Sequence, residues 1–122
     1  MQPLRTFRDL LVWKKGHELV LLTYKKTQSF PNSEQFGLTS QLRRAAVSVT
    51  SNIAEGFSRR SSKEKIQFYY MAHGSLSELE NQIEIAKDID YMSVQSFNSL
   101  MNLSSEVGKL LNGLINKTKL RE

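Results

Sequence analysis

The basic side chains of this sequence have the types and spacing that suit one kind of chemistry, the binding of phosphate groups. Two arginine pairs, Arg43–Arg44 and Arg59–Arg60, lie within the run from Gly37 to Arg60. Arginine and lysine on helix faces and at loops can bind phosphates without reading a base sequence. The candidate phosphate-contact residues are Arg43, Arg59, Arg60, Lys63, Lys14 and Lys15.

Aromatic side chains lie close to the second arginine pair. Phe57, Tyr69 and Tyr70 could stack on unpaired bases beside these cations. A solvated charged face above aromatic core residues explains the same pattern equally well, so both interpretations stay open.

Patterns for catalysis or metal binding are weak in this sequence. His17 and His73 have no second ligand three or four residues away, and there is no cysteine, so we expect neither a metal site nor a cofactor. The serines lack a nucleophile elbow, and nothing indicates that Glu55 and Glu78 converge. The sequence therefore disfavours an enzyme, and an active site between subunits is the distant alternative.

A second set of polar side chains is expected to be structural. Pairing two helices antiparallel about a turn near residues 58–59 places Arg44 opposite Glu78 and Glu55 near Lys63 or Arg59. Polar groups inside a bundle are usually hydrogen-bonded. The predicted network consists of Arg44, Glu78, Asn52 and Glu55. We expect Arg44 to be buried in this network, so Arg44→Ala is predicted to destabilise the fold.

Four amphipathic helices are needed to position these residues. Apolar residues recur at spacings of three and four over residues 7–28, 34–56, 62–88 and 94–117, and the connections are short. The sequence therefore predicts one all-α domain over residues 1–122, an antiparallel up-down-up-down four-helix bundle. The polar tail Lys117–Glu122 is expected to fray.

Helix ends are marked by capping residues. Thr6, Ser61 and Ser93 suit the N-caps of the first, third and fourth helices, with acidic partners at Asp9 and Glu64. Ser33 or Thr39 could cap the second helix. Gly56 suits a left-handed C-cap of that helix.

The first helix is apolar over much of its circumference. The residues expected to share one face are Leu10, Trp13, His17, Val20 and Tyr24, and leucines at positions 11, 19, 21 and 22 widen it. A helix of this kind usually has two neighbours. One neighbour could lie in the same subunit and one in another.

The charge balance is compatible with a polyanion as partner. The 122-residue chain carries a net charge of +5, yet residues 61–90 hold three basic and six acidic side chains. The acidic segment could pair with a basic neighbour, or the basic segments could form an outer surface for RNA or DNA. The sequence has no signal-peptide pattern and no stretch of about 20 apolar residues, so we expect a cytoplasmic protein without membrane contact.

A long ordered set of motifs resembles a known family. The motifs are Phe7–Lys15, Tyr24, Phe30–Pro31, Glu34–Val49, Ser51–Phe57 and Gly74–Glu80. They resemble the four helix bundle proteins encoded within intervening sequences of bacterial large-subunit ribosomal RNA genes, some of which carry a ribosomal-protein label. One departure is Thr50, where the family commonly has a proline that would kink the helix.

The resemblance implies a four-helix bundle that assembles as a homopentamer without catalytic residues. The family is also similar to the accessory variability protein of diversity-generating retroelements, a pentamer that binds nucleic acid and a reverse transcriptase. Residues and resemblance together favour a non-enzymatic oligomeric bundle that binds RNA or DNA through basic surfaces. The alternative is a protein-interaction scaffold, or an accessory subunit of a nucleic-acid enzyme such as a reverse transcriptase.

Overall fold

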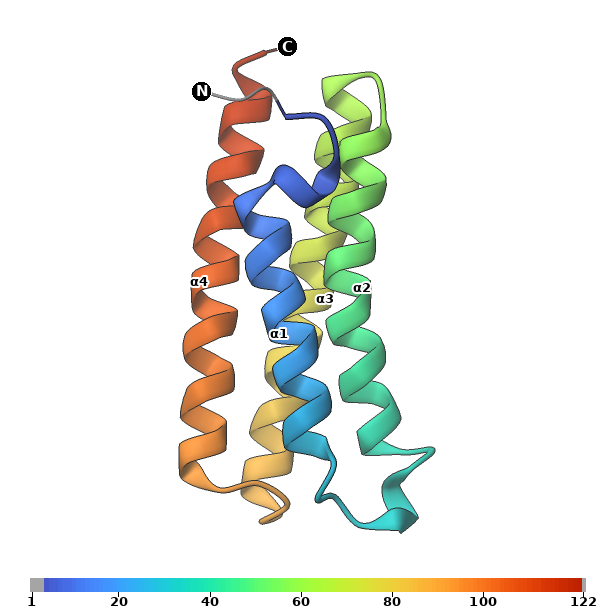
Figure 1. Ribbon diagram of the computed structural model, residues 1–122, viewed down its shortest axis with the longest axis vertical. Coiled ribbons are helices and arrows are strands. Elements are labelled where there is room, and N and C mark those ends of the chain that lie inside the picture. Colours follow the sequence, from blue (N-terminus) through green and yellow to red (C-terminus); the bar gives the residue numbers. More distant parts are fainter. Residues whose placement is uncertain (1–3, 122) are drawn as a thin grey trace.

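The computed structural model describes residues 4–121, so positions 1–3 and 122 of the predicted domain lie outside the described residues. Four long helices, α1 (Leu11–Thr27), α2 (Leu38–Ser58), α3 (Ser62–Asp88) and α4 (Val94–Lys119), run alternately along one axis (Figure 1). Two short 3₁₀ turns, η1 (Phe7–Asp9) and η2 (Asn32–Glu34), precede α1 and α2. The prediction of an antiparallel all-α bundle is confirmed.

The four helices form a square in cross-section. Helix α1 packs against α2 and α4, and α3 packs against the same two helices from the other side, with the most extensive packing between α2 and α3. The core is lined by aliphatic side chains of all four helices and by the buried ring of Tyr69. The connection from α2 to α3 and the C-terminal end of α4 consequently lie at the same end of the bundle (Figure 1).

The chain begins differently from the predicted helix over residues 7–28. Thr6 and Asp9 form the expected capping box, but the box caps the single turn η1. Leu10 then adopts an extended conformation (φ −75°, ψ 127°), and α1 begins at Leu11. Leu10 is buried in the core, so this break turns an apolar side chain inward at the start of α1.

The buried face of α1 differs from the predicted one. Its buried residues are Val12, Gly16, Leu19, Thr23 and Thr27. His17 and Tyr24, which the apolar pattern placed on the inner face, are exposed. The hydroxyls of Thr23 and Thr27 donate to the carbonyl oxygens four residues earlier, at 2.7 and 2.8 Å. A threonine that is satisfied by its own helix can occupy a core position at little cost.

Glu34, and neither Ser33 nor Thr39, caps the start of α2. Gly37 is the N-cap residue and has no side chain to offer, so the Glu34 carboxylate accepts from the backbone N–H of Leu38 at 3.1 Å. The other carboxylate oxygen accepts from the Tyr91 hydroxyl at 2.9 Å. These two hydrogen bonds lower the pKa of Glu34. The Glu34–Tyr91 contact joins the α1–α2 and α3–α4 connections at the end opposite the α2–α3 turn (Figure 1).

Gly56 lies inside α2 and has a packing role there. The predicted left-handed cap at this position is wrong. Helix α2 continues unbroken past Thr50 to Ser58, and Arg59 ends it in an extended conformation. No glycine among residues 4–121 has a positive φ. A Cβ on Gly56 would lie 2.7 Å from Cε1 of Tyr69, so the absence of a side chain lets the Tyr69 ring of α3 lie against the α2 backbone.

The last two helices follow the prediction more closely. Ser61 and Ser93 cap α3 and α4 by accepting from the backbone N–H three residues later, at 3.1 Å in each case. Ser61 also donates to the Glu64 carboxylate at 3.1 Å. The tail is more ordered than expected, because α4 continues to Lys119 and Thr118 is buried, while Glu122 lies outside the described residues.

No helix within residues 4–121 has the length and apolar character needed to cross a membrane.

Gly56→Ala is expected to destabilise the protein by about 1–3 kcal/mol, because the added methyl group would push the Tyr69 ring away from α2. Urea denaturation followed by circular dichroism measures the change. Gly74→Ala is the matched control, since a Cβ there meets no atom within 4 Å. Alanine favours a helix by about 0.5–1 kcal/mol over glycine, so this control is expected to stabilise the protein. Equal effects of the two substitutions would contradict the packing role of Gly56.

Candidate nucleic-acid interface

Basic side chains gather at the end of the bundle formed by the α2–α3 turn and the C-terminal end of α4. Residues 55–65 and 117–121 hold seven basic and two acidic side chains. We call this surface the basic end, and its cations are Arg59, Arg60, Lys63, Lys65, Lys117, Lys119 and Arg121. Two chain segments that are distant in sequence therefore supply the basic end, and Figure 1 shows that they lie at the same end of the bundle.

Arg60 and Lys63 are the freest cations of the α2–α3 turn. Both side chains are exposed, and neither forms an ion pair within the described part of the chain. Arg60 lies in the extended segment between the helices, and Lys63 lies in the first turn of α3. Both groups can meet an approaching anion without first breaking an internal contact.

Arg59 is held by its own turn. Its guanidinium lies 3.6 Å from the Glu55 carboxylate and 4.0 Å from that of Glu64, and it covers the ring of Phe68 at 4.7 Å. The predicted proximity of Glu55 to Arg59 is confirmed. These contacts neutralise part of the charge of Arg59 and shape the turn that presents Arg60.

Lys65 lies at the start of α3, where the positive charge of Arg121 acts on it. The Lys65 ammonium donates to the Phe57 carbonyl oxygen at the end of α2, at 2.7 Å. Burial lowers the pKa of Lys65, and the charge of Arg121 lowers it further. Two like charges held near each other repel, and a bound anion relieves that repulsion.

The other sequence-predicted cations lie elsewhere. Lys15 is half-buried and forms ion pairs with Glu18 at 3.3 Å and Glu106 at 3.5 Å, which raise its pKa. Lys14 is exposed on α1. The structure thus brings Arg59, Arg60 and Lys63 together and does not bring Lys15 to them as a free cation.

Arg43 is occupied by the C-terminal end of α1. Its Nε donates to the Thr27 hydroxyl at 3.0 Å, Nη2 donates to the Tyr24 carbonyl oxygen at 3.5 Å, and the guanidinium lies 4.6 Å from the Tyr24 ring centre. Arg43 lies in the first third of α2, away from the α2–α3 turn (Figure 1). Its contacts indicate that it joins α1 to α2.

Lys117, Lys119 and Arg121 belong to the basic end but are not among the predicted contact residues. The sequence predicts a frayed tail, and a frayed tail has no fixed place relative to the α2–α3 turn. The antiparallel topology of the bundle could have identified these three cations. In that topology, the end of the fourth helix lies beside the turn between the second and third helices.

The three aromatic side chains near the turn differ in accessibility. Tyr69 is 1% exposed, and burial raises the pKa of Tyr69 to about 12. Phe57 is half-buried beneath Lys65, with 5.2 Å between the ammonium and the ring centre. Tyr70 is 50% exposed. Of the three predicted stacking residues, Tyr70 is the most accessible, and the Lys119 ammonium lies 5.5 Å from its ring centre.

The predicted polar network forms only in part. Asn52 donates to the Ser48 carbonyl oxygen at 2.9 Å, and the Ser48 and Ser75 hydroxyls lie 2.8 Å apart, which links α2 to α3. The predicted burial of Arg44 is wrong, because its side chain is exposed. Arg44 and Glu78 line the same surface pocket without an ion pair within 4.0 Å. Glu78 instead accepts from Gln82 at 3.2 Å.

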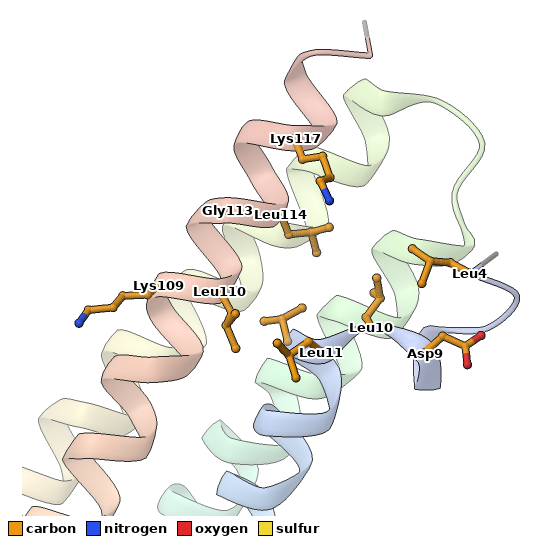
Figure 2. Close-up of a pocket in the computed structure, with 10 residues that line it drawn as sticks. Leu4, Asp9, Leu10, Leu11, Lys109, Leu110, Gly113, Leu114 and Lys117 are labelled. Carbon is orange, nitrogen blue, oxygen red and sulfur yellow. The ribbon is translucent and has the colours of Figure 1, made fainter. Parts of the chain in front are cut away.

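A second surface feature is an apolar groove between the start of α1 and the last turns of α4. Figure 2 shows leucine side chains from the segment that precedes α1, from α1 and from α4 around this groove, which has a volume of about 400 Å³. Leu4 and Leu11 are more than half exposed there. Lys109 and Lys117 lie on its α4 side. The part of the chain that the structure describes contains no cluster of three or more His, Cys, Asp or Glu residues able to hold a metal ion.

The fold and the charge distribution define a small antiparallel four-helix bundle with one basic end. Residues 8–113 match the family model of the 23S rRNA-intervening sequence protein, and the chain belongs to that family. No curated protein matches the chain.

Solved structures similar to this chain include a protein of Bacteroides thetaiotaomicron VPI-5482 from the S23 ribosomal protein family. The two chains are 25% identical and superpose with a TM-score of 0.77, over 86% of this chain and 98% of the other. That protein is described as having unknown function, so the comparisons establish family and fold without an activity.

Arg43→Ala is expected to lower the free energy of unfolding by about 1 kcal/mol, because Thr27 and Tyr24 lose their partner. The matched control Arg44→Ala removes the same charge from an exposed neighbour and is expected to change stability by less than about 0.5 kcal/mol. Thermal and urea denaturation of both variants measure the difference. If Arg44→Ala lowers the free energy of unfolding more than Arg43→Ala does, the result would instead support a buried pairing of Arg44 with Glu78.

Proposed function

We propose that this chain is a non-enzymatic cytoplasmic protein that binds RNA or DNA through the phosphate groups at its basic end. The observation that carries the proposal is the exposure of Arg60 and Lys63, without ion-pair partners among residues 4–121, in the turn between α2 and α3 and at the start of α3. Phosphate oxygens accept hydrogen bonds from arginine and lysine and carry the complementary charge.

The arrangement favours backbone contact over reading of base sequence. The cations lie at one end of the bundle, in the α2–α3 turn, at the start of α3 and near the end of α4 (Figure 1). A protein that reads bases in a duplex inserts a helix or strand into a groove. The basic end presents helix ends and a turn, so we expect affinity with little sequence preference and a strong dependence on salt.

Arg60→Ala/Lys63→Ala is expected to weaken nucleic-acid binding and to reduce its salt dependence. Removing one phosphate-binding cation lowers the slope of log K against log salt concentration by about 0.7–0.9. Fluorescence anisotropy with mixed-sequence RNA and DNA, titrated at several salt concentrations, measures both quantities.

Lys25→Ala/Lys26→Ala is the charge-matched control, because these two lysines lie in the last turn of α1. This variant is expected to retain most of the nucleic-acid affinity and of its salt dependence. Undetectable binding by the unmodified protein, or binding that does not change with salt, would overturn the proposal. Equal losses for the two double variants would remove the basic end as the binding surface.

We further propose that copies of the chain associate, with five as the number that the family resemblance implies. The apolar groove supports association, because Leu4 and Leu11 would be shielded from water when another copy covers them. Exposed apolar side chains of this size are a common feature of surfaces that other proteins cover.

Light scattering at micromolar concentration is expected to give five times the 14.0 kDa subunit mass. Leu11→Glu is expected to reduce that mass, because it places a charge in the groove, whereas Leu120→Glu changes an exposed leucine that does not line the groove. A monomer for the unmodified protein would contradict self-association.

The groove also supports the second candidate function, a scaffold or accessory subunit that binds another protein. A monomer that retains a protein partner after nuclease treatment, and loses it on Leu11→Glu, would favour this second function over the first.

A further inference from the structure

Tyr70 is placed where an unpaired base could stack beside the cations of the basic end. Its side chain is 50% exposed on α3, and the Lys119 ammonium of α4 lies 5.5 Å from its ring centre. Lys63 precedes it by seven residues, which is about two helical turns, so the two side chains share one face of α3. Tyr70 therefore lies between a cation of α3 and a cation of α4.

The orientation of Tyr70 is fixed by its neighbours in the helix. Ile66 and Tyr69 are 8% and 1% exposed, so they hold this part of α3 against the core. The Tyr69 ring also lies against Gly56 of α2. Successive helical residues point about 100° apart, and α3 cannot rotate to bury Tyr70 without exposing Tyr69. The ring is thus presented by a rigid element and needs little ordering when a ligand binds.

We infer that the basic end recognises unpaired nucleotides, with Tyr70 as the stacking surface and Lys63 and Lys119 as phosphate contacts. This inference rests on the proposed nucleic-acid binding and names the class of ligand. Aromatic side chains stack on every kind of base, so the arrangement gives a preference for single strands without a preference for sequence.

A duplex cannot use Tyr70 in this way. Its bases are already stacked on each other, and the deep major groove of an RNA helix is closed to side chains. A duplex can still reach the cations through its phosphates, so it would bind through charge alone. The difference between single-strand and duplex affinity therefore reports the contribution of the ring.

The test compares a single-stranded uridine oligonucleotide with an RNA duplex of equal length at one salt concentration, by fluorescence anisotropy. The unmodified protein is expected to bind the single strand more tightly. Tyr70→Ala is expected to lower the single-strand affinity about five-fold or more and to leave duplex affinity within two-fold. Tyr70→Phe retains the ring and is expected to retain the affinity.

Met71→Ala is the control for loss of an exposed apolar side chain, since Met71 is 55% exposed on the next position of α3. It is expected to leave both affinities unchanged, and circular dichroism shows that each variant is folded. If Tyr70→Ala leaves single-strand affinity intact, or lowers single-strand and duplex affinity equally, the stacking inference is overturned while nucleic-acid binding stands. If the unmodified protein binds neither oligonucleotide, the proposed function fails and this inference fails with it.

Discussion

The close approach of α2 to α3 is the constraint on which the rest of the structure depends. Gly56, on the inner face of α2, leaves room for the Tyr69 ring of α3, and Ala45 and Ala46 are further small residues buried on α2. The α2–α3 pair has the most extensive packing of the bundle, and the Ser48–Ser75 contact adds a polar link on its outer side. This packing fixes the short turn that carries Arg59 and Arg60 and aims the first turns of α3. The proposed surface is therefore a property of the tightest helix pair, because side chains on a mobile turn would have no fixed spacing.

The sequence predicts the inner faces of α2 and α3 well and that of α1 poorly, for a physical reason. Helices α2 and α3 bury aliphatic and aromatic residues at regular spacing, for example Leu42, Val49 and Ile53, so periodicity identifies the inner face. The inner face of α1 contains Gly16, Thr23 and Thr27, which an apolar pattern does not count. These residues are compatible with the core because the threonine hydroxyls bond within the helix and Gly16 lies against α2. A pattern of apolar and polar residue types does not reveal such hydrogen bonds within a helix or such close packing at a glycine.

The candidate site was predictable as a charge cluster at the α2–α3 turn that includes Arg59, Arg60 and Lys63, but its full membership was not. Arg43 and Lys15 have the same residue types as Arg60 and Lys63, yet the first two are held by partners from other elements. Whether a cation is free depends on which carboxylates and carbonyl groups the packed bundle brings to it. The tail cations join the surface only because α4 stays helical to Lys119. Residue type alone therefore indicates a basic protein, and tertiary packing selects the charges that face outward.

The contact between α1 and α2 at Gly16 has a consequence for how relatives of this protein can vary. A Cβ at position 16 would lie 3.0 Å from the Cγ2 methyl of Thr50, so the two positions share a single small volume. A relative with alanine at position 16 gains helix propensity, but its added methyl group requires the side chain at position 50 to shift by a few tenths of an ångström or to be smaller. Conversely, a residue that lacks this methyl branch at position 50 frees the first position to enlarge. Substitutions at these two sites should thus appear as correlated exchanges across the family, with the order of the two steps constrained by the intermediate that still folds.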